Sequence, residues 1–254
     1  MSVPQIYTGA SGLVLPVPNK LSYPPEFQEK SRLCYYASLF NSIEVNSSFY
    51  KIPMASTMRK WAVDVPDHFK FTFKLFREIT HNKQLAFNPE DLTLFMQRIN
   101  GVGDKKGCLL VQFPPSLGID HIKQLGELLQ QITDVNSDEP WKVAIEFRNR
   151  SWYNDEVYEL IEQYQFSVVI HDIPASTTPL SDDLPGTEVY LRFHGPNGGY
   201  RGSYTDDFLY EYASYIKDWQ AEGKMVYVYF NNTMGSAVQN LMTLNKYLSA
   251  QTED

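Results

Sequence analysis

The stretch Cys108-Leu109-Leu110-Val111 is an apolar run without polar alternation, and Ser167-Val168-Val169-Ile170 repeats this pattern later in the chain. Alternation of apolar and polar residues is typical of strands with one face in water. Continuous runs are typical of parallel strands that are covered on both faces. The two stretches therefore indicate a parallel sheet with helices packed outside it.

Similar short β-rich runs recur along the whole chain. There are eight of them: Gln5–Thr8, Ser42–Asn46, Phe69–Lys74, Cys108–Phe113, Lys142–Phe147, Ser167–Ile170, Val189–Phe193 and Met225–Phe230. Segments with helical period separate them, as in Ile122, Leu125, Leu129 and Ile132. Eight such units close a parallel sheet into a barrel, so we predict an α/β fold with a single (β/α)8 TIM-type barrel over residues 1–254. A doubly wound open sheet is the alternative.

Cap and turn residues mark several of the boundaries. Asn88 is expected to cap a helix that begins at Pro89 and ends before Gly101. Thr205 is expected to open another helix. By contrast, Asp172 to Thr187 contains three prolines and has no helical period, which predicts an irregular loop as the sixth crossover.

Composition restricts the partners. The formal net charge of −8 gives no long-range attraction to phosphate backbones, so nucleic acid is disfavoured as a partner unless a local basic patch exists. Cys34 and Cys108 lie among apolar residues, which favours two buried thiols in a reducing compartment over a disulfide. The residues from Met1 to Gly12 lack a signal-peptide pattern, and no apolar run approaches the ~18 residues that span a bilayer. These features predict a cytoplasmic protein without membrane contact.

Polar residues gather where the predicted strands end, and in nearly all characterised barrels this end carries the active site. They are Glu44, Asn46, Lys74, Gln112, Glu146, Arg148, His171, Asp172, Arg192, His194, Asn231 and Asn232. Three pairs share a strand face by the two-residue period: Glu44 with Asn46, Glu146 with Arg148, and Arg192 with His194. If the pairs face the barrel axis they converge, although any one of them could simply be a polar residue leaving the sheet for solvent.

Five of these residues form the predicted catalytic set. Glu146 is the leading candidate for a general acid or base, and its alternative is a carboxylate held permanently in a salt bridge. Lys74 could act as a nucleophilic amine if it were desolvated beside other cations, but an ion-pair role is favoured. Glu44, His171 and His194 complete the set.

Ligand-binding residues are expected at the same strand ends and in the loops that follow. We expect this role for Asn46, Tyr50, His81, Gln112, Arg148, Trp152, Arg192, Arg201 and Asn231. The rings of Tyr50 and Trp152 could stack on a sugar or a base, with loop packing as the alternative.

Two glycine-containing loops suggest an anion site. They are His194–Gly202 and Asn231–Ser236, and loops at these positions of a barrel commonly bind phosphate. Glycines let backbone N–H groups approach an anion, and Arg201 could add charge. A glycine-rich turn without a ligand is the alternative.

No metal or cofactor is predicted. Glu44, Glu146, His171, Asp172 and His194 could supply ligands to a divalent metal, but there is no two-histidine helical motif and no cysteine pair. A bound divalent metal therefore stays an alternative that the spacing of these residues does not support.

The same residues carry a family resemblance along nearly the whole chain. The matching segments are Thr8–Gly12, Tyr35–Ala37, Glu44–Tyr50, Phe73–Lys74, Ile79–His81, Gln112–Pro115, Glu146–Asn149, Ser151–Trp152, Tyr190–Gly195 and Tyr227–Asn232. In these segments the chain resembles the YecE-like family, a bacterial domain of unknown function (72). The resemblance implies a TIM-type barrel and no particular reaction. Ala10 departs from the usual Gly-Thr-Ser-Gly pattern, and the first crossover lacks a tryptophan often seen there.

Together these features predict an enzyme of hydrolase or lyase type that binds a small anionic or phosphorylated molecule at the mouth, with acid-base chemistry by Glu, Lys, Arg and His. The alternatives are a nucleic-acid-processing or binding barrel and a non-catalytic interaction module. A retaining glycosidase is disfavoured, because the ends of the fourth and seventh strands hold Gln112 and His194 where many barrel glycosidases hold carboxylates. The sequence does not specify the oligomeric state.

Overall fold

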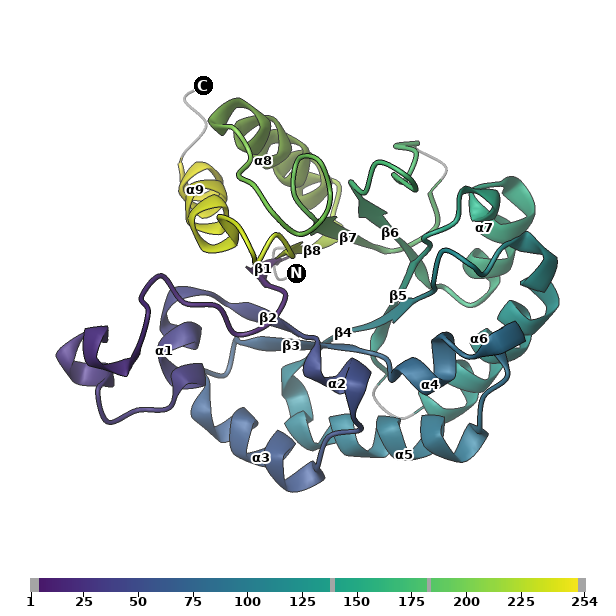
Figure 1. Cartoon of the computed structure of the whole chain (residues 1–254), viewed down its shortest axis with the longest axis horizontal. Coiled ribbons are helices and arrows are strands. Elements are labelled where there is room, and N and C mark those ends of the chain that lie inside the picture. Colours follow the sequence, from purple (N-terminus) through teal and green to yellow (C-terminus); the bar gives the residue numbers. More distant parts are fainter. Residues whose placement is uncertain (1–4, 138–139, 182–183, 251–254) are drawn as a thin grey trace.

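The computed structural model describes residues 5–137, 140–181 and 184–250. A curved sheet of parallel strands forms a barrel with helices on its outside (Figure 1). The strands are β1 (Ile6–Ala10), β2 (Ser42–Val45), β3 (Lys70–Lys74), β4 (Lys106–Gln112), β5 (Lys142–Glu146), β6 (Ser167–His171), β7 (Glu188–Phe193) and β8 (Met225–Phe230). Their order in the sheet is β1-β8-β7-β6-β5-β4-β3-β2. The predicted TIM-type barrel is confirmed.

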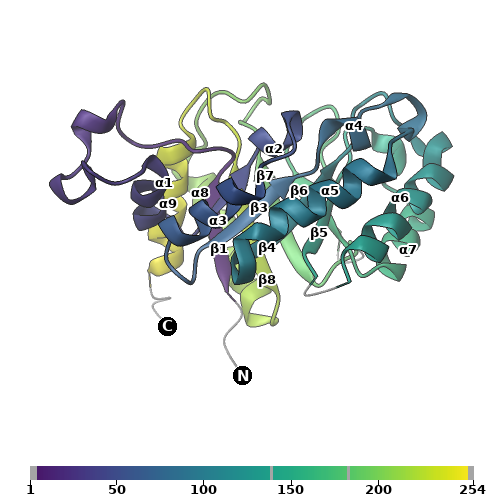
Figure 2. The same cartoon turned by 90° about the horizontal axis from the view of Figure 1, so that it is seen from below.

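Helices connect most of these strands. They are α1 (Arg32–Leu39), α2 (Ser47–Tyr50), α3 (Ala55–Asp64), α4 (Arg77–Thr80), α5 (Pro89–Ile99), α6 (Ile122–Val135), α7 (Asp155–Gln163), α8 (Asp206–Ala221) and α9 (Ala237–Ser249). The side chain of Asn88 caps α5 and that of Thr205 caps α8, as predicted. The short helices α2 and α4 follow the carboxyl ends of β2 and β3 and lie over that end of the barrel (Figure 2).

The sixth crossover is irregular, as predicted. Its described residues between β6 and β7 contain no helix, while residues 182 and 183 lie outside the described part. Across residues 5–137, 140–181 and 184–250, no helix has the length and apolar character that crossing a bilayer requires.

The barrel closes at a seam between β1 and β2. Only one backbone bridge, between Ser11 and Glu44, joins their ends in the described chain. Between them lies the side chain of Asn41, whose Oδ1 accepts from the Thr8 amide and whose Nδ2 donates to the Ile6 carbonyl, both at 2.8 Å. A side-chain amide therefore replaces part of the backbone ladder.

Tyr36 supplies the rest of the seam. Its hydroxyl accepts from the Ala10 amide at 2.7 Å and donates to the Ser42 carbonyl at 3.0 Å. A Cβ atom on Gly9 would lie 2.1 Å from the Ser42 carbonyl oxygen, so this close approach requires glycine. β1 continues past Thr8, where its β-rich composition stops, because Gly9 and Ala10 pair with Tyr229 and Phe230 of β8.

Two packed regions fill the molecule. The larger core lies between the sheet and the helices, and a second cluster fills the barrel interior. The interior cluster contains the four tyrosines that we call the tyrosine layer: Tyr7, Tyr190, Tyr227 and Tyr229. Cys108 is buried in this cluster, whereas Cys34 is only half-buried, which corrects the expectation of two buried thiols. Both cysteines are free.

Candidate active site at the barrel mouth

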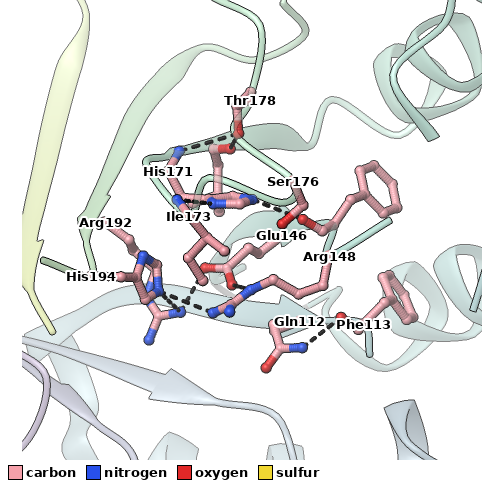
Figure 3. A network of polar contacts seen from close by, with 12 residues as sticks. Gln112, Phe113, Glu146, Arg148, His171, Ile173, Ser176, Thr178, Arg192 and His194 are labelled. Carbon is pink, nitrogen blue, oxygen red and sulfur yellow. Dashed lines mark hydrogen bonds and ion pairs between the residues drawn. The ribbon is translucent and has the colours of Figure 1, made fainter. Parts of the chain in front are cut away.

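Arg192, near the end of β7, is the centre of the mouth and is only 1% exposed. Its Nε and Nη2 donate to the two carboxylate oxygens of Glu44 at 2.9 and 2.6 Å. Its Nη1 donates to Oε2 of Glu146 at 2.6 Å (Figure 3). One guanidinium thus joins β7 to β2 and β5 across the barrel.

Glu44 is saturated with hydrogen-bond donors. Besides Arg192, it accepts from the Ser11 hydroxyl at 2.5 Å and from the Tyr190 hydroxyl at 2.6 Å. Burial would raise the pKa of Glu44, but the charge of Arg192 and these hydrogen bonds hold it below its ordinary value. Glu44 therefore holds Arg192 in place, and both of its oxygens are occupied.

Glu146 lies between two guanidinium groups. It accepts from Arg192 on one oxygen and from Nε of Arg148 on the other. Burial alone would raise the pKa of Glu146, yet the two arginines lower it well below its usual range. The geometry favours the salt-bridge alternative over the predicted acid role, because a carboxyl group that stays ionised has no proton to donate.

His194 has a defined tautomer. Its Nε2 lies 3.0 Å from Nη2 of Arg148 and 3.2 Å from Nη1 of Arg192. Guanidinium nitrogens only donate, so Nε2 accepts and the proton sits on Nδ1, which faces Oδ1 of Asp172 at 3.3 Å. Burial lowers the pKa of His194 to about 4. The imidazole is neutral and its lone pair is engaged, which suits a positioning role better than the predicted catalytic one.

His171 faces the loops rather than the mouth. Its Nε2 lies 2.8 Å from the Phe147 carbonyl and carries the proton, while Nδ1 accepts from the Ile173 amide at 3.3 Å (Figure 3). Burial lowers the pKa of His171 below its ordinary value. These contacts fix the end of β6 against β5 and offer no support for the predicted catalytic role.

Above this ion-pair layer, which we define as Glu44, Glu146, Arg148, Arg192 and His194, lies a cavity of about 290 Å³. Its lining residues are Asn46, Phe49, Tyr50, Lys74, Arg148, Arg192, Tyr200, Asn231, Thr233 and Met234. Six of them belong to the predicted site: Asn46, Tyr50, Lys74, Arg148, Arg192 and Asn231. Three of the lining residues are cationic, and none of those in this described lining is acidic.

Lys74 differs from the two arginines. Its Nζ donates to Oε1 of Gln112 at 2.7 Å and lies 4.0 Å from the centre of the Phe49 ring. No carboxylate in the described part of the chain forms an ion pair with it, so the favoured ion-pair role is not what the structure shows. Burial, followed by the charge of Arg192, lowers the pKa of Lys74 to about 7.

Four predicted ligand-binding residues do not line the cavity, and one of them, Gln112, instead accepts a hydrogen bond from Lys74. Trp152 is fully buried, stacks on Phe147 at 5.1 Å and donates from Nε1 to the Leu117 carbonyl at 2.7 Å. The prediction that Trp152 stacks on a ligand is therefore wrong, because protein side chains already cover the indole. His81 packs edge-on against Phe49 at 4.8 Å and does not line the cavity.

Arg201 is the fourth of these residues. The glycine loops around it do not support the interpretation as a phosphate site. Arg201 is exposed and does not line the cavity. The two loops bond to one another through their amides: Met234 donates to the Tyr200 carbonyl and Ser236 to the Gly202 carbonyl, each at 3.0 Å. Because these N–H groups already have acceptors, the alternative of a structural glycine turn fits them better.

The residues that position Glu44 were missed by the sequence analysis. Tyr190 lies two residues before Arg192 on the same strand face, so the period that grouped Arg192 with His194 could also have identified it. Ser11 follows β1 directly, and only the seam geometry brings its hydroxyl to Glu44.

The residues considered as metal ligands are bonded to protein partners. Asp172 accepts from the His194 amide at 2.7 Å and from the Tyr204 hydroxyl. Among the residues whose placement the structure describes, no three His, Cys, Asp or Glu side chains converge as metal ligands do. The polar side chains that line the cavity carry guanidinium, amine, amide and hydroxyl groups.

Comparison with known proteins agrees with this architecture. The model of the family described as "Protein of unknown function DUF72" matches residues 7–254. The chain belongs to the DUF72 family. The resemblance to YecE-like proteins is thereby confirmed. The UPF0759 protein YunF of Bacillus subtilis (strain 168) is 26% identical over 244 residues, which is 84% of each chain. The UPF0759 protein YecE of Escherichia coli (strain K12) is 27% identical over 97 residues, or 38% of this chain and 36% of YecE.

Solved structures show the same fold as this DUF72 chain. A DUF72 protein from Enterococcus faecalis V583 has a TM-score of 0.78 at 24% identity and covers 98% of both chains. One from Thermotoga maritima MSB8 has a TM-score of 0.78 at 25% identity, covering 96% of this chain and 99% of that one. A D-psicose 3-epimerase has a TM-score of 0.52 at 12% identity, covering 85% and 88% of the two chains, and shares the barrel fold alone.

Proposed function

We propose that this DUF72 protein is an enzyme that binds a small anionic molecule in the mouth cavity. The observation that carries the proposal is the lining: Lys74, Arg148 and Arg192 face one cavity whose described lining has no acidic residue, in a chain of net charge −8. Such a local reversal of charge focuses the field on the cavity and attracts anions.

The charge balance beneath the cavity supports this proposal. Glu44 and Glu146 together neutralise two guanidinium groups, those of Arg148 and Arg192, so the charge of Lys74 is in excess when its amine is protonated. Arg148 donates from Nε to Glu146 and from Nη2 to His194. Its Nη1 has no hydrogen-bond partner among the described residues and can donate to a ligand. A bound anion would complete the balance.

The size of the cavity favours a small metabolite. Ligand pockets usually enclose about 300–1,000 Å³, and the volume here, about 290 Å³, is just below that range. Asn46 and Asn231 add amide groups that can orient a polar ligand, and Tyr50 and Tyr200 add hydroxyls at the rim. We place the acid-base chemistry on Lys74 rather than on Glu146, which supports a lyase more than a hydrolase.

Anion binding can be tested without breaking the ion pairs. Thr233 is a half-buried lining residue with no part in the ion-pair layer. In a thermal-shift titration with inorganic phosphate, pyrophosphate and small carboxylates, we expect stabilisation of the native protein and of Thr233→Asn. Thr233→Asp puts a negative charge in the cavity and should abolish the shift.

Arg148→Met should likewise lose the shift, whereas Arg59→Met, an exposed position on α3, should keep it. The proposal fails if no anion stabilises the native protein at millimolar concentration, or if Thr233→Asp responds as Thr233→Asn does. A mobility shift with DNA or RNA at low salt would instead favour a nucleic-acid-binding barrel.

A further inference from the structure

Lys74 is the one cation of the mouth cavity that has no carboxylate partner in the described chain. Arg148 and Arg192 are each bonded to a glutamate, whereas Nζ of Lys74 contacts an amide oxygen and the face of Phe49. The side chain is the last of β3, at the carboxyl end of the barrel, and it lines the cavity. An amine in this position can meet a bound ligand directly.

The surroundings of Lys74 disfavour its protonated form, so that the neutral amine is also populated near pH 7. Burial is the largest influence and lowers its pKa, and the guanidinium groups add to this effect, while the carboxylates of the ion-pair layer oppose it. The net result is a pKa of about 7. Four charged groups influence the pKa of Lys74: Arg192 on β7, Glu146 on β5, Arg148 after β5 and Glu44 on β2. His81, after α4, interacts electrostatically with Lys74 and packs against Phe49.

We propose that Lys74 is a catalytic nucleophile that forms an imine with the aldehyde or ketone group of a small anionic substrate. This proposal rests on the proposed function, because the anionic group of the substrate would be held at Arg148 and Arg192. The expected substrates are therefore carbonyl compounds that carry a carboxylate or phosphate.

The reaction balances without an oxidant or a reductant. The lone pair of Nζ attacks the carbonyl carbon, a C–N bond forms, and the carbonyl oxygen becomes a hydroxyl by taking a proton from the nitrogen. The hydroxyl then takes a further proton from the solvent, the C–O bond breaks, and water leaves while the lone pair of the nitrogen forms the C=N bond. The protonated imine withdraws electrons from the neighbouring carbon, so that a C–H or C–C bond there can break, which is lyase chemistry.

Reductive trapping tests the proposal directly. The full-length protein is incubated with pyruvate, glyoxylate or dihydroxyacetone phosphate and sodium cyanoborohydride, and the adduct is located by peptide mass mapping. We expect one of these probes to modify Lys74 in the native protein. The control variant Lys70→Arg, which changes the lysine at the other end of β3, should be modified at Lys74 in the same way. Lys74→Arg keeps the charge, cannot form the imine and should show no adduct at this position.

The pH profile separates a catalytic amine from an ordinary lysine. Trapping at Lys74 should rise with pH and level off just above its pKa of about 7, whereas exposed lysines should keep rising toward their ordinary value of about 10.4. Modification confined to exposed lysines, or no adduct with any probe, overturns the proposal. If no adduct forms at Lys74 but the native protein still gives the phosphate shift in the thermal assay, anion binding stands and only the imine is wrong; if neither is seen, both proposals fail.

Discussion

The ion-pair layer at the mouth and the tyrosine layer beneath it fill the same barrel, yet each is stable in a different protonation state. Glu44 and Glu146 are held ionised by arginines, whereas Tyr190 and Tyr229 are held protonated, since burial raises their pKa values well above 10.0. The mouth thus loses stability when carboxyls gain protons, and the layer beneath loses stability when phenols lose them.

The signs of the two pH effects are opposite. A carboxyl whose pKa is lowered by folding stabilises the protein above its ordinary value of 4.5, and this contribution disappears as the pH falls below it. A phenol whose pKa is raised by folding stabilises it below 10.0, and this contribution disappears at higher pH because the unfolded chain ionises there. The ion-pair layer therefore contributes to loss of stability in acid, and the tyrosine layer contributes to loss of stability in alkali.

The two layers also differ in how much they stabilise the fold. Stacked and tilted rings, such as Tyr7 on Tyr227 at 5.1 Å, stabilise by burying large apolar surfaces. Buried ion pairs are weak contributors, because desolvation of the charges offsets much of their attraction. An ion-pair layer directly below a cavity is better explained by the anionic ligand that we propose for this cavity than by stability.

The largest effect is expected from Arg192→Met. Without the guanidinium, Glu44 and Glu146 become buried carboxylates with too few partners, and we expect a loss of about 3–5 kcal/mol at pH 7 in urea unfolding. Lowering the pH toward 5 should restore part of the loss, since the carboxyls can then be neutral. Arg59→Met should change little. A loss below about 1 kcal/mol for Arg192→Met would mean that the layer is not tightly coupled.

A smaller effect of the opposite sign is expected from Lys74→Met. Because the pKa of Lys74 falls from 10.5 to about 7 on folding, the protonated amine destabilises the native state below pH 7. This penalty shrinks as the pH rises from 7 toward 10.5. Lys74→Met should be more stable than the native protein by on the order of a few kcal/mol at pH 6, and by less at pH 9. A variant that is destabilised equally at both pH values would show that the amine is charged and favourably bound.

The smallest effect is expected from Tyr229→Phe in the tyrosine layer. The hydroxyl of Tyr229 lies 2.6 Å from that of Ser42 and 2.8 Å from that of Thr72. Both keep another partner, since Ser42 also donates to the Lys70 carbonyl and Thr72 accepts from the Cys108 amide. The loss should be about 1 kcal/mol in urea unfolding at pH 7. A loss as large as that of Arg192→Met would remove the contrast between the layers.

The fold could be predicted from the sequence because its signals are local. Continuous apolar runs, helical period and caps such as Asn88 depend on neighbours in the chain, and the strands lie within a few residues of the predicted runs. The largest differences are of two residues. β4 begins at Lys106, before the predicted Cys108, and β1 continues past Thr8 to Ala10 through contacts with a distant strand and with Tyr36.

The site could be predicted only in part. The two-residue period correctly gathered Glu44, Glu146, Arg148 and Arg192 at one end of the barrel. It could not reveal which cation each carboxylate contacts, because those contacts run across the barrel between strands far apart in sequence. For the same reason Lys74 was expected to be ion-paired, and only the structure shows that the arginines occupy both carboxylates.

The seam between β1 and β2 has a consequence for how the protein is made. β1 finds its full ladder on β8, where Ile6 pairs with Val226, while β2 offers it one bridge and the side chains of Asn41 and Tyr36. Contacts between distant parts of a chain slow folding. On the ribosome, β1 must therefore wait for β8, and the nascent chain carries an open sheet edge at β1 until β8 has been synthesised.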